Sequence, residues 1–472
     1  MDPDGAKGLT TMNTPTRDIG LVWFRRDLRL QDNPAWSAAT AQHDVVVALY
    51  VIDPRLFDRA GSFRRQQLLA NLHALDETLA GHGGRLFVRH GDPVDLVSET
   101  VHRFGVARAY WNADVTPFAA RRDLQVEQGL AIPVQTFWGS LVHAPGTVLT
   151  AKGTLSRVFT PFYKAWHRRP WDEWPVPGDA SVSAEVGDSI PSLEVSGSGP
   201  GGETAALTRL EAFLDRVDDY ETRRDLPAED GTSLLSTDLR FGTLSPRTVS
   251  DVVGESTAGR TAFVRQLAWR DWYAHLLVEL PEFPHHAMRE PFDHLTWRND
   301  PDDIAAWKSG TTGYPIVDAG IRQLLATGWM HNRVRMIVAS FLVKDLLVDW
   351  RIGERYFRHL LVDGDVAQNV GNWQWVAGTG PDSSPYHRVF NPVVQSRKFD
   401  ASGAYLRHWI PELARLRDDE IHAPWENAPL DLAMAGVELG VDYPHPIVEH
   451  SQARVRALDA YAKVRLRPAG ES

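Results

Sequence analysis

The chain has 472 residues, 43% of them hydrophobic and 24% charged, a composition typical of a globular protein with more than one domain. Its net charge of −11 argues against a protein whose whole surface binds polyanions, and the absence of cysteine excludes disulfides, thiolate nucleophiles and cysteine-ligated metals. No apolar run approaches the ~20 residues of a membrane span, and residues 1–17 resemble neither a signal nor a transit peptide. We therefore expect a cytoplasmic protein.

Short β-branched runs alternate with helical patterns over the first 140 residues. Helical spacing covers Phe63–Leu79 and Pro93–Phe104. The short apolar runs that alternate with such helical segments are Ile19–Phe24, Asp44–Ile52, Arg85–Arg89, Val106–Asn112 and Ile132–Phe137. Such alternation predicts a parallel sheet with helices on both faces. We expect residues 18–140 to form a doubly wound α/β domain.

A charged turn, Arg25–Arg29, follows the first predicted strand. The glycine-rich turn of a dinucleotide-binding Rossmann unit is not found there, which argues against a dinucleotide held in that manner. The residues alone favour a solvated turn over one that locks the sheet edge or a ligand crevice.

The second half of the chain is dominated by helical spacing. Gly178–Gly202 is rich in Gly, Ser and Pro, and we place an interdomain linker at residues 141–202. Residues 203–472 are expected to form a mostly α-helical domain. The helical patterns cover Thr204–Tyr220, Thr261–Leu280, Pro315–Thr327 and Asn332–Trp350, and residues 447–466 suggest a closing helix.

Two polar motifs and a set of tryptophans carry possible chemistry. Gly231–Ser236 is rich in hydroxyl groups, which suit either phosphate oxygens or a helix cap. Asp363-Gly364-Asp365 suits a turn, hydrogen bonds to a ribose or flavin, or a metal, but no ligand set at metal spacing accompanies it, so we expect no metal. Core packing explains most tryptophans in most proteins, but 17 is a high number, and a row of indoles can also pass an electron, although spacing alone cannot show such a row.

Several longer motifs, in the same order, resemble the photolyase/cryptochrome family. The first is Leu21–Arg29 with Asp32 and Asn33. The others are Thr312–Pro315, Trp329–Arg333, Asp363–Asp365 and Asn372–Trp375. The resemblance is strongest to microbial class I cyclobutane pyrimidine dimer photolyases. It implies an N-terminal antenna domain, a helical FAD-binding domain and light-dependent repair of pyrimidine dimers in DNA.

The resemblance also implies residue roles. Those that would bind FAD are Tyr220, Arg224, Thr232, Ser233, Leu235, Ser236, Arg270, Arg335, Asp363, Asp365 and Asn369. Leu234 stands where relatives commonly carry Arg, so one cationic contact is absent. Asn369 would face the reactive flavin nitrogen, where a neutral amide tunes the cofactor without adding charge. Trp373, Trp350 and Trp297 match an electron-transfer row, from the inner to the outer position.

DNA-binding roles follow from the same resemblance. Trp269 and Trp375 would stack on a flipped-out dimer. The remaining implied contacts are Gln266, Asn332, Arg333, Met336 and Arg397, with Arg388 and Lys398 as further phosphate contacts.

Gln266 departs from the pattern, because class I repair enzymes usually carry Glu there. Gln donates a hydrogen bond but no proton. It is also the residue of enzymes that repair six-four photoproducts, yet those carry a second His where this chain has Asn332. Repair of cyclobutane dimers therefore remains the preferred function, and a six-four photolyase or a cryptochrome-type photoreceptor are the alternatives. A generic flavin oxidoreductase is not supported, because the sequence has no nicotinamide-binding motif.

The resemblance further implies a monomer and an antenna chromophore, either a folate (methenyltetrahydrofolate) or a deazaflavin.

Overall fold

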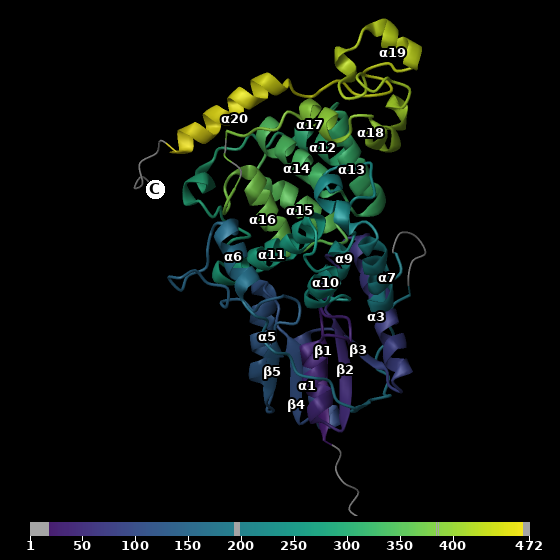
Figure 1. Cartoon of the computed structure of the whole chain (residues 1–472), viewed down its shortest axis with the longest axis vertical. Coiled ribbons are helices and arrows are strands. Elements are labelled where there is room, and N and C mark those ends of the chain that lie inside the picture. Colours follow the sequence, from purple (N-terminus) through teal and green to yellow (C-terminus); the bar gives the residue numbers. More distant parts are fainter. Residues whose placement is uncertain (1–17, 193–198, 384, 386, 466–472) are drawn as a thin grey trace, which may run out of the picture.

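The computed structural model describes residues 18–192, 199–383, 385 and 387–465. An α/β domain lies at the lower end of Figure 1, and a larger helical part lies above it. The N-terminal stretch that we expect to be neither signal nor transit peptide lies outside the described residues. This arrangement confirms the predicted fold class, an α/β doubly wound domain followed by a mostly helical one.

Five parallel strands form the central sheet in the order β3-β2-β1-β4-β5. Their bounds are β1 Ile19–Phe24, β2 Val45–Ile52, β3 Leu86–His90, β4 Arg108–Asn112 and β5 Val134–Phe137. Ile19 aligns with Val45 in the register of β1 and β2. The central strands β1 and β2 are buried along nearly their whole length, as parallel strands between two helical layers must be, whereas the edge strand β5 is partly exposed.

Alternate residues of each strand face different helices. Helices α1 (Pro34–Gln42) and α3 (Ser62–Gly81) share a core with Val22 and Phe24. Helices α4 (Pro93–Phe104) and α5 (Pro117–Gly129) share a second core, which contains Trp23. The two-residue period of a strand therefore separates two hydrophobic layers.

The charged turn after β1 is buried, so the interpretation as a solvated turn is wrong. Asp27 and Arg29 are each 1% exposed. Asn112 Nδ2 donates to Asp27 at 2.5 Å, and Arg29 donates to the carbonyl oxygens of Gly139 (2.7 Å) and Gly242 (2.9 Å). Because Gly242 belongs to the helical part, the turn fastens the sheet to it.

The segment between the two predicted domains is built into both of them. Its helix α6 (Phe159–Arg168) contributes Phe159, Phe162 and Trp166 to the core of the helical part. Its strand β6 (Ser181–Val182) pairs with the start of β2. The Gly- and Ser-rich residues 193–198 lie outside the described residues.

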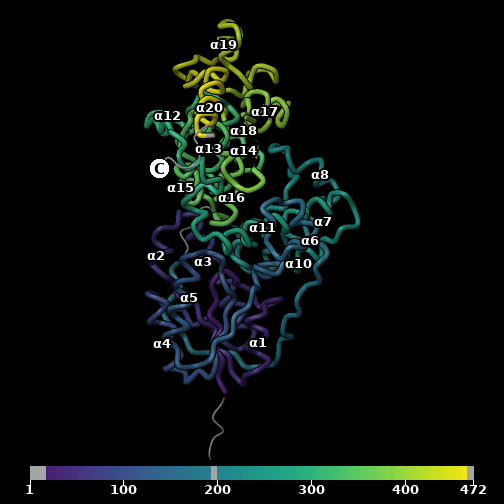
Figure 2. The backbone as a smooth tube through the Cα atoms, turned by 90° about the vertical axis from the view of Figure 1, so that its left-hand side faces the viewer, coloured from purple at the N-terminus to yellow at the C-terminus, as the bar shows by residue number. Residues whose placement is uncertain are grey.

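The helical part packs as two groups of helices. In Figure 2, α6, α7, α8 and α10 lie on one side, and α12 to α16 lie on the other. The bounds are α7 Gly202–Leu214, α8 Tyr220–Arg223, α9 Ser236–Phe241, α10 Pro246–Val253, α11 Ala258–Glu279, α12 Pro301–Ser309, α13 Pro315–Thr327, α14 Asn332–Ser340, α15 Trp350–Leu360, α16 Val366–Ala377, α17 Pro392–Phe399, α18 Ala404–Trp409, α19 Pro429–Ala435 and α20 His450–Arg465. Short α2 spans Pro54–Phe57 in the α/β domain.

The single helix predicted over Asn332–Trp350 is wrong. Helix α14 runs into a π turn at Phe341–Asp345, and Leu347 takes a left-handed φ of 53°. Asp349 then accepts a hydrogen bond from the Arg351 amide and caps α15. A capping carboxylate and one left-handed residue therefore divide a continuous apolar pattern into two helices.

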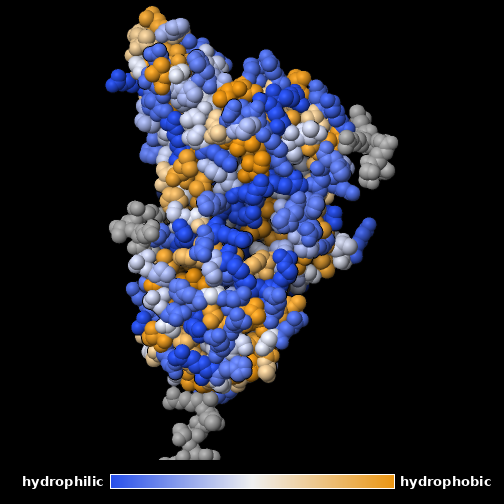
Figure 3. Space-filling view, turned by 180° about the vertical axis from the view of Figure 1, so that it is seen from behind, coloured by the Kyte–Doolittle hydropathy of each residue, from blue (hydrophilic) through white to orange (hydrophobic). Residues whose placement is uncertain are grey.

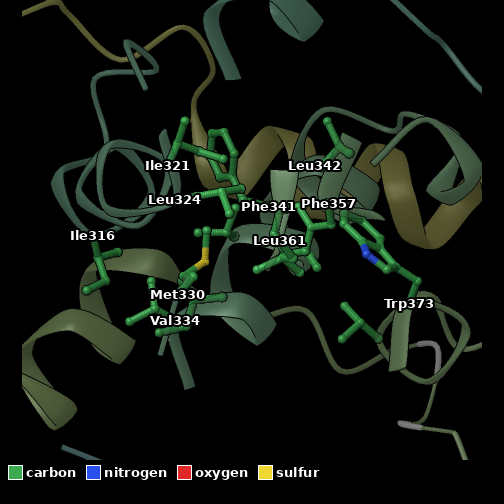
Figure 4. Close-up of a cluster of buried hydrophobic side chains, with 14 of the residues drawn as sticks. Ile316, Ile321, Leu324, Met330, Val334, Phe341, Leu342, Phe357, Leu361 and Trp373 are labelled. Atoms are coloured by element: carbon green, nitrogen blue, oxygen red, sulfur yellow. The ribbon is translucent and has the colours of Figure 1, made fainter. Parts of the chain in front are cut away.

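The core of the helical part lies where α13, α14, α15 and α16 meet. Figure 4 shows one continuous cluster that runs from Leu324 of α13 past Phe341 of the π turn to Phe357 of α15 and Trp373 of α16, whose rings lie 5.0 Å apart. The packing fixes one wall of the site described below.

The described residues contain no helix long and apolar enough to cross a membrane. The surface in Figure 3 mixes hydrophilic residues with scattered hydrophobic ones. One hydrophobic group lies on the lobe around α19, at the upper left, where Leu430 and Met434 are 71% and 78% exposed.

Candidate functional site

A cavity of about 940 Å³ lies between the two groups of helices and above the α/β domain. Its walls come from α6, α8, α9, α11, α14 and α16. Most of the residues singled out from the sequence line it: Tyr220, Arg224, Thr232, Ser236, Gln266, Trp269, Arg270, Asn332, Arg333, Arg335, Met336, Asp363, Asp365, Asn369, Trp373 and Trp375. The structure thus brings together segments that are up to 155 residues apart in the chain, from Tyr220 to Trp375.

The Asp363 carboxylate forms the best-connected part of the cavity wall. Arg335 donates to it through both terminal nitrogens, at 3.2 and 2.9 Å. Ser236 Oγ, at the start of α9, donates to it at 2.7 Å. A two-point guanidinium contact is geometrically specific, so the three side chains hold one arrangement.

Asp365 is held by both domains. It caps α16 by accepting from the Gln368 amide at 3.0 Å, and its other oxygen pairs with Arg26 of the charged turn. Burial acts to raise the pKa of Asp365, but the guanidinium groups of Arg26, Arg240 and Arg270 outweigh it and hold that pKa well below its usual range. A carboxylate therefore stays ionised at the base of the cavity.

Asn369 has a fixed amide orientation. Its Nδ2 donates to both the backbone carbonyl and a carboxylate oxygen of Glu354, each at 2.9 Å. Burial raises the pKa of Glu354. Because the amide nitrogen is bonded to Glu354, the amide oxygen of Asn369, an acceptor, is the atom available to a ligand in the cavity.

Only some residues of the hydroxyl-rich segment Gly231–Ser236 line the cavity. Thr232 and Ser236 line the cavity. Ser233 instead accepts a hydrogen bond from the Leu235 amide at 3.3 Å, and Leu235 is 1% exposed. Leu234 has a left-handed φ of 57° and points away, 46% exposed. Ser233 and Leu235 therefore support the loop rather than face the cavity.

Arg224 and Tyr220 form the opposite end. The Arg224 guanidinium lies 5.7 Å from the Tyr220 ring centre. Burial raises the pKa of Tyr220 to about 12, so the phenol stays neutral. Arg224 makes no ion pair with a carboxylate of the described residues, and its charge is available to an anion.

Helix α11 supplies one side of the mouth. Gln266 and Trp269 lie one turn apart on it, so both face the cavity. Gln266 Nε2 donates to the Ala262 carbonyl at 3.0 Å. Arg270 donates to the Ser140 carbonyl (2.5 Å), which joins α11 to the end of the α/β domain, and to the Leu239 carbonyl of α9 (3.0 Å).

Helix α14 supplies the other side, with Asn332 and Met336 one turn apart. Arg333 beside them is paired with Asp225, at 2.8 Å, and lies 4.4 Å from the Phe399 ring centre. That pairing leaves Arg333 less free for a phosphate than its sequence position suggests. Arg397 does not line the cavity, and it pairs loosely with Glu426 at 3.5 Å.

Of the three tryptophans in the predicted row, Trp373 alone lines the cavity. It is 2% exposed and its indole lies against Gly353 of α15, a helix that begins with Trp350. Trp350 is 1% exposed. Trp297 is half-buried and lies edge-on to Tyr461 of α20, with ring centres 6.4 Å apart.

Sequence reasoning missed Tyr163, Arg240 and Arg265, which also line the cavity. Tyr163 belongs to α6, in the segment predicted to be a linker. Arg265 precedes Gln266, so its place on the same helix was the available signal. No sequence signal brings Tyr163 to this wall, because only the packing of α6 on α11 does so.

The comparisons with known proteins cover both parts of the chain. The family model described as DNA photolyase matches residues 20–178, and the one described as the FAD binding domain of DNA photolyase matches residues 263–463. A deoxyribodipyrimidine photo-lyase from Agrobacterium fabrum is 41% identical over 94% of this chain and 98% of its own length.

Two solved structures have similar folds. A bacterial class III photolyase from Agrobacterium tumefaciens has a TM-score of 0.90 and 38% identity, covering 97% of this chain and 100% of its own. A cryptochrome from Synechocystis has a TM-score of 0.87 and 31% identity, covering 94% and 99%.

Proposed function

Because this chain belongs to the DNA photolyase family, we propose that it repairs cyclobutane pyrimidine dimers in DNA by light-driven electron transfer from reduced FAD. One observation carries the proposal. A single cavity is lined by Asp363, Asp365 and Asn369 and also by Gln266 and Trp269. Residues suited to a flavin and residues suited to a lesion therefore face the same space.

The cavity fits FAD in chemistry. Two carboxylates, the buried Asp363 and the partly buried Asp365, suit N–H and hydroxyl donors of a flavin and ribose. Arg224, without a described carboxylate partner, together with the hydroxyls of Thr232 and Ser236, suits a pyrophosphate. Bound FAD in its reduced form supplies light absorption and the electron. A second, antenna chromophore belongs to the same proposal.

The protein's own contribution is to bind and orient. Trp269 and Trp375 offer aromatic faces to a dimer flipped out of the duplex, where each stacked base contributes ~1–3 kcal/mol. One Nε2 hydrogen of Gln266 bonds the Ala262 carbonyl, and the amide keeps a second N–H for the pyrimidine edge. Asn332 and Met336 line the same cavity from α14. Exclusion of water by these side chains strengthens every polar contact inside.

The remaining roles follow the same proposal. Trp373, Trp350 and Trp297 would return FAD to its reduced state by passing an electron inward. Arg397 would contact a phosphate of the DNA, where such contacts position the duplex without reading its sequence. We propose a monomer in the cytoplasm.

A photoreceptor of cryptochrome type is the second candidate, because a Synechocystis cryptochrome shares the fold at a TM-score of 0.87. A six-four photolyase is the third, because Gln266, the residue that such enzymes carry at this position, lines the cavity on the side proposed for the lesion. Asn332 in the facing wall favours the cyclobutane lesion over it.

The test is repair of a defined oligonucleotide. Purified, photoreduced protein is incubated with a thymine-dimer duplex in blue light and in darkness. We expect intact thymines only in light. No repair by protein that holds reduced FAD would rule out the cyclobutane proposal, and the same assay with a six-four lesion then separates the other two candidates.

A further inference from the structure

Trp269 has one face already occupied. Its indole stacks on the ring of Phe159 with centres 3.7 Å apart and planes 11° from parallel. Trp272 meets it edge-on at 5.2 Å. Since Trp269 also lines the cavity, the face opposite Phe159 is the one that a base can reach.

Phe159 is itself held from several sides. It is 1% exposed, and its backbone amide donates to the Asp382 carboxylate at 3.1 Å. Tyr163, one turn further along α6, stacks beside it at 5.9 Å and 19°. The Arg265 guanidinium lies over both rings, at 5.4 and 5.2 Å. Three nearly parallel rings thus extend from α6 to the lesion wall.

The two helices that carry this stack are fixed to each other. Asp271 of α11 is fully buried and accepts from Trp166 Nε1 of α6 at 2.9 Å. It also accepts from the amides of Val142 (3.1 Å) and His143 (3.0 Å), which precede α6 in the chain. The segment predicted to be a linker is therefore anchored at Asp271, two residues after Trp269 and five after Gln266.

We propose that Phe159 is a positioning residue for lesion binding, holding the Trp269 indole in the one plane that receives a flipped pyrimidine. A flat ring 3.7 Å behind the indole leaves it no freedom to tilt. The ordering of Trp269 is then complete before DNA arrives, and binding loses less side-chain entropy. The inference rests on the proposed function, because it assigns a role within the same site.

Phe159→Leu keeps an apolar side chain but removes the flat face. We expect the affinity for a duplex with one thymine dimer to fall about tenfold, while binding of the undamaged duplex stays unchanged. Phe159→Tyr, which keeps the ring, restores most of the affinity. Phe162→Leu is the matched control, since Phe162 lies on the same helix, is also 1% exposed and shares the Trp272 contact of Phe159, but its other ring partner is His275 and not Trp269.

A double-mutant cycle with Trp269→Leu shows whether Phe159 acts through Trp269. We expect F159L to cost about tenfold in the wild-type background and nothing further beside W269L. The same loss in both backgrounds, or the same loss from F162L, would overturn the inference, because either result indicates general packing of α6.

The failure of this inference is distinguishable from failure of the proposed function. Wild-type protein without any preference for dimer DNA would overturn both. A wild-type preference that F159L retains would overturn this inference alone. All variants are measured as FAD-bound protein, and Phe159→Met replaces F159L in both measurements should F159L lose its flavin absorbance.

Discussion

At the scale of single residues, the site depends on polar groups whose partners fix their state. The Asn369 amide nitrogen donates to Glu354, so the amide oxygen is the atom free to accept a hydrogen bond from a ligand. Asp225 pairs with Arg333, so a residue expected to meet DNA phosphates is largely committed within the protein. The sequence identified these residues as candidates. It could not identify the partners, which come from 15 and 108 positions away.

His331 gives a pH-dependent prediction. It is 2% exposed and caps α14 by accepting from the Arg333 amide at 3.2 Å. Burial lowers its pKa from 6.5 to about 4, although Asp225 acts to raise it. Between these two pH values the unfolded chain is protonated at His331 and the folded one is not. Stability present above pH 6.5 is therefore lost as the pH falls toward 4, by up to about 3 kcal/mol.

His331→Asn keeps the capping acceptor and removes this titration. We expect the free energy of unfolding of the variant to fall by about 3 kcal/mol less than that of the wild type between pH 6.5 and pH 4. Denaturant unfolding at a series of pH values measures it. Burial raises the pKa of Asp318 and Asp345, but both are present in the two proteins and cancel in the comparison. Parallel pH profiles would contradict the assignment.

At the scale of elements, periodicity located most helices and strands, while local capping and close contacts decided their ends. Helix α13 has the predicted bounds Pro315–Thr327. The pattern from Asn332 onward was misleading, since buried residues continue through the break at Leu347. The break matters, because it starts a new helix at Trp350 and aims Gly353 at Trp373.

Gly353→Ala tests that contact. A methyl group at this position would overlap the Trp373 indole, which must then move. We expect a loss of about 1–3 kcal/mol in the free energy of unfolding, as in other overpacked cores, and slower photoreduction of bound FAD. Gly81→Ala at the end of α3 is the control, because the added methyl meets nothing within 4 Å. Equal stability of the two variants would contradict the close contact.

At the scale of the whole molecule, the charged turn after β1 couples the two domains. Arg26 pairs with Asp365 at the base of the cavity and lies 3.4 Å from Asp114 of the α/β domain. Arg29 and Arg270 add hydrogen bonds in both directions across the boundary. The α/β domain therefore directly supports Asp365 and the part of the cavity that we propose for the flavin.

Arg26→Gln removes one charge from this boundary. Breaking an isolated buried ion pair costs about 3–5 kcal/mol, and we expect about 2–3 kcal/mol here because Arg240 and Arg270 still face Asp365. Retention of FAD should fall with stability. Arg85→Gln is the control, since Arg85 is 46% exposed in its pair with Asp76 and its loss should leave stability close to that of the wild type. Denaturant unfolding and flavin absorbance measure both effects, and an unchanged R26Q protein would contradict the coupling.

The order of elements, the fold class and the family follow from the sequence, because hydrophobic periodicity and long ordered motifs are local properties of the chain. The tertiary structure decided what depends on contacts between distant residues. It buried a turn of charged residues that looks solvated, since its partners Gly242 and Asp365 lie more than 200 positions away. It also made α6 part of the cavity wall that we propose for the lesion, because the stacking of Phe159 on Trp269 joins segments with no shared pattern in the sequence.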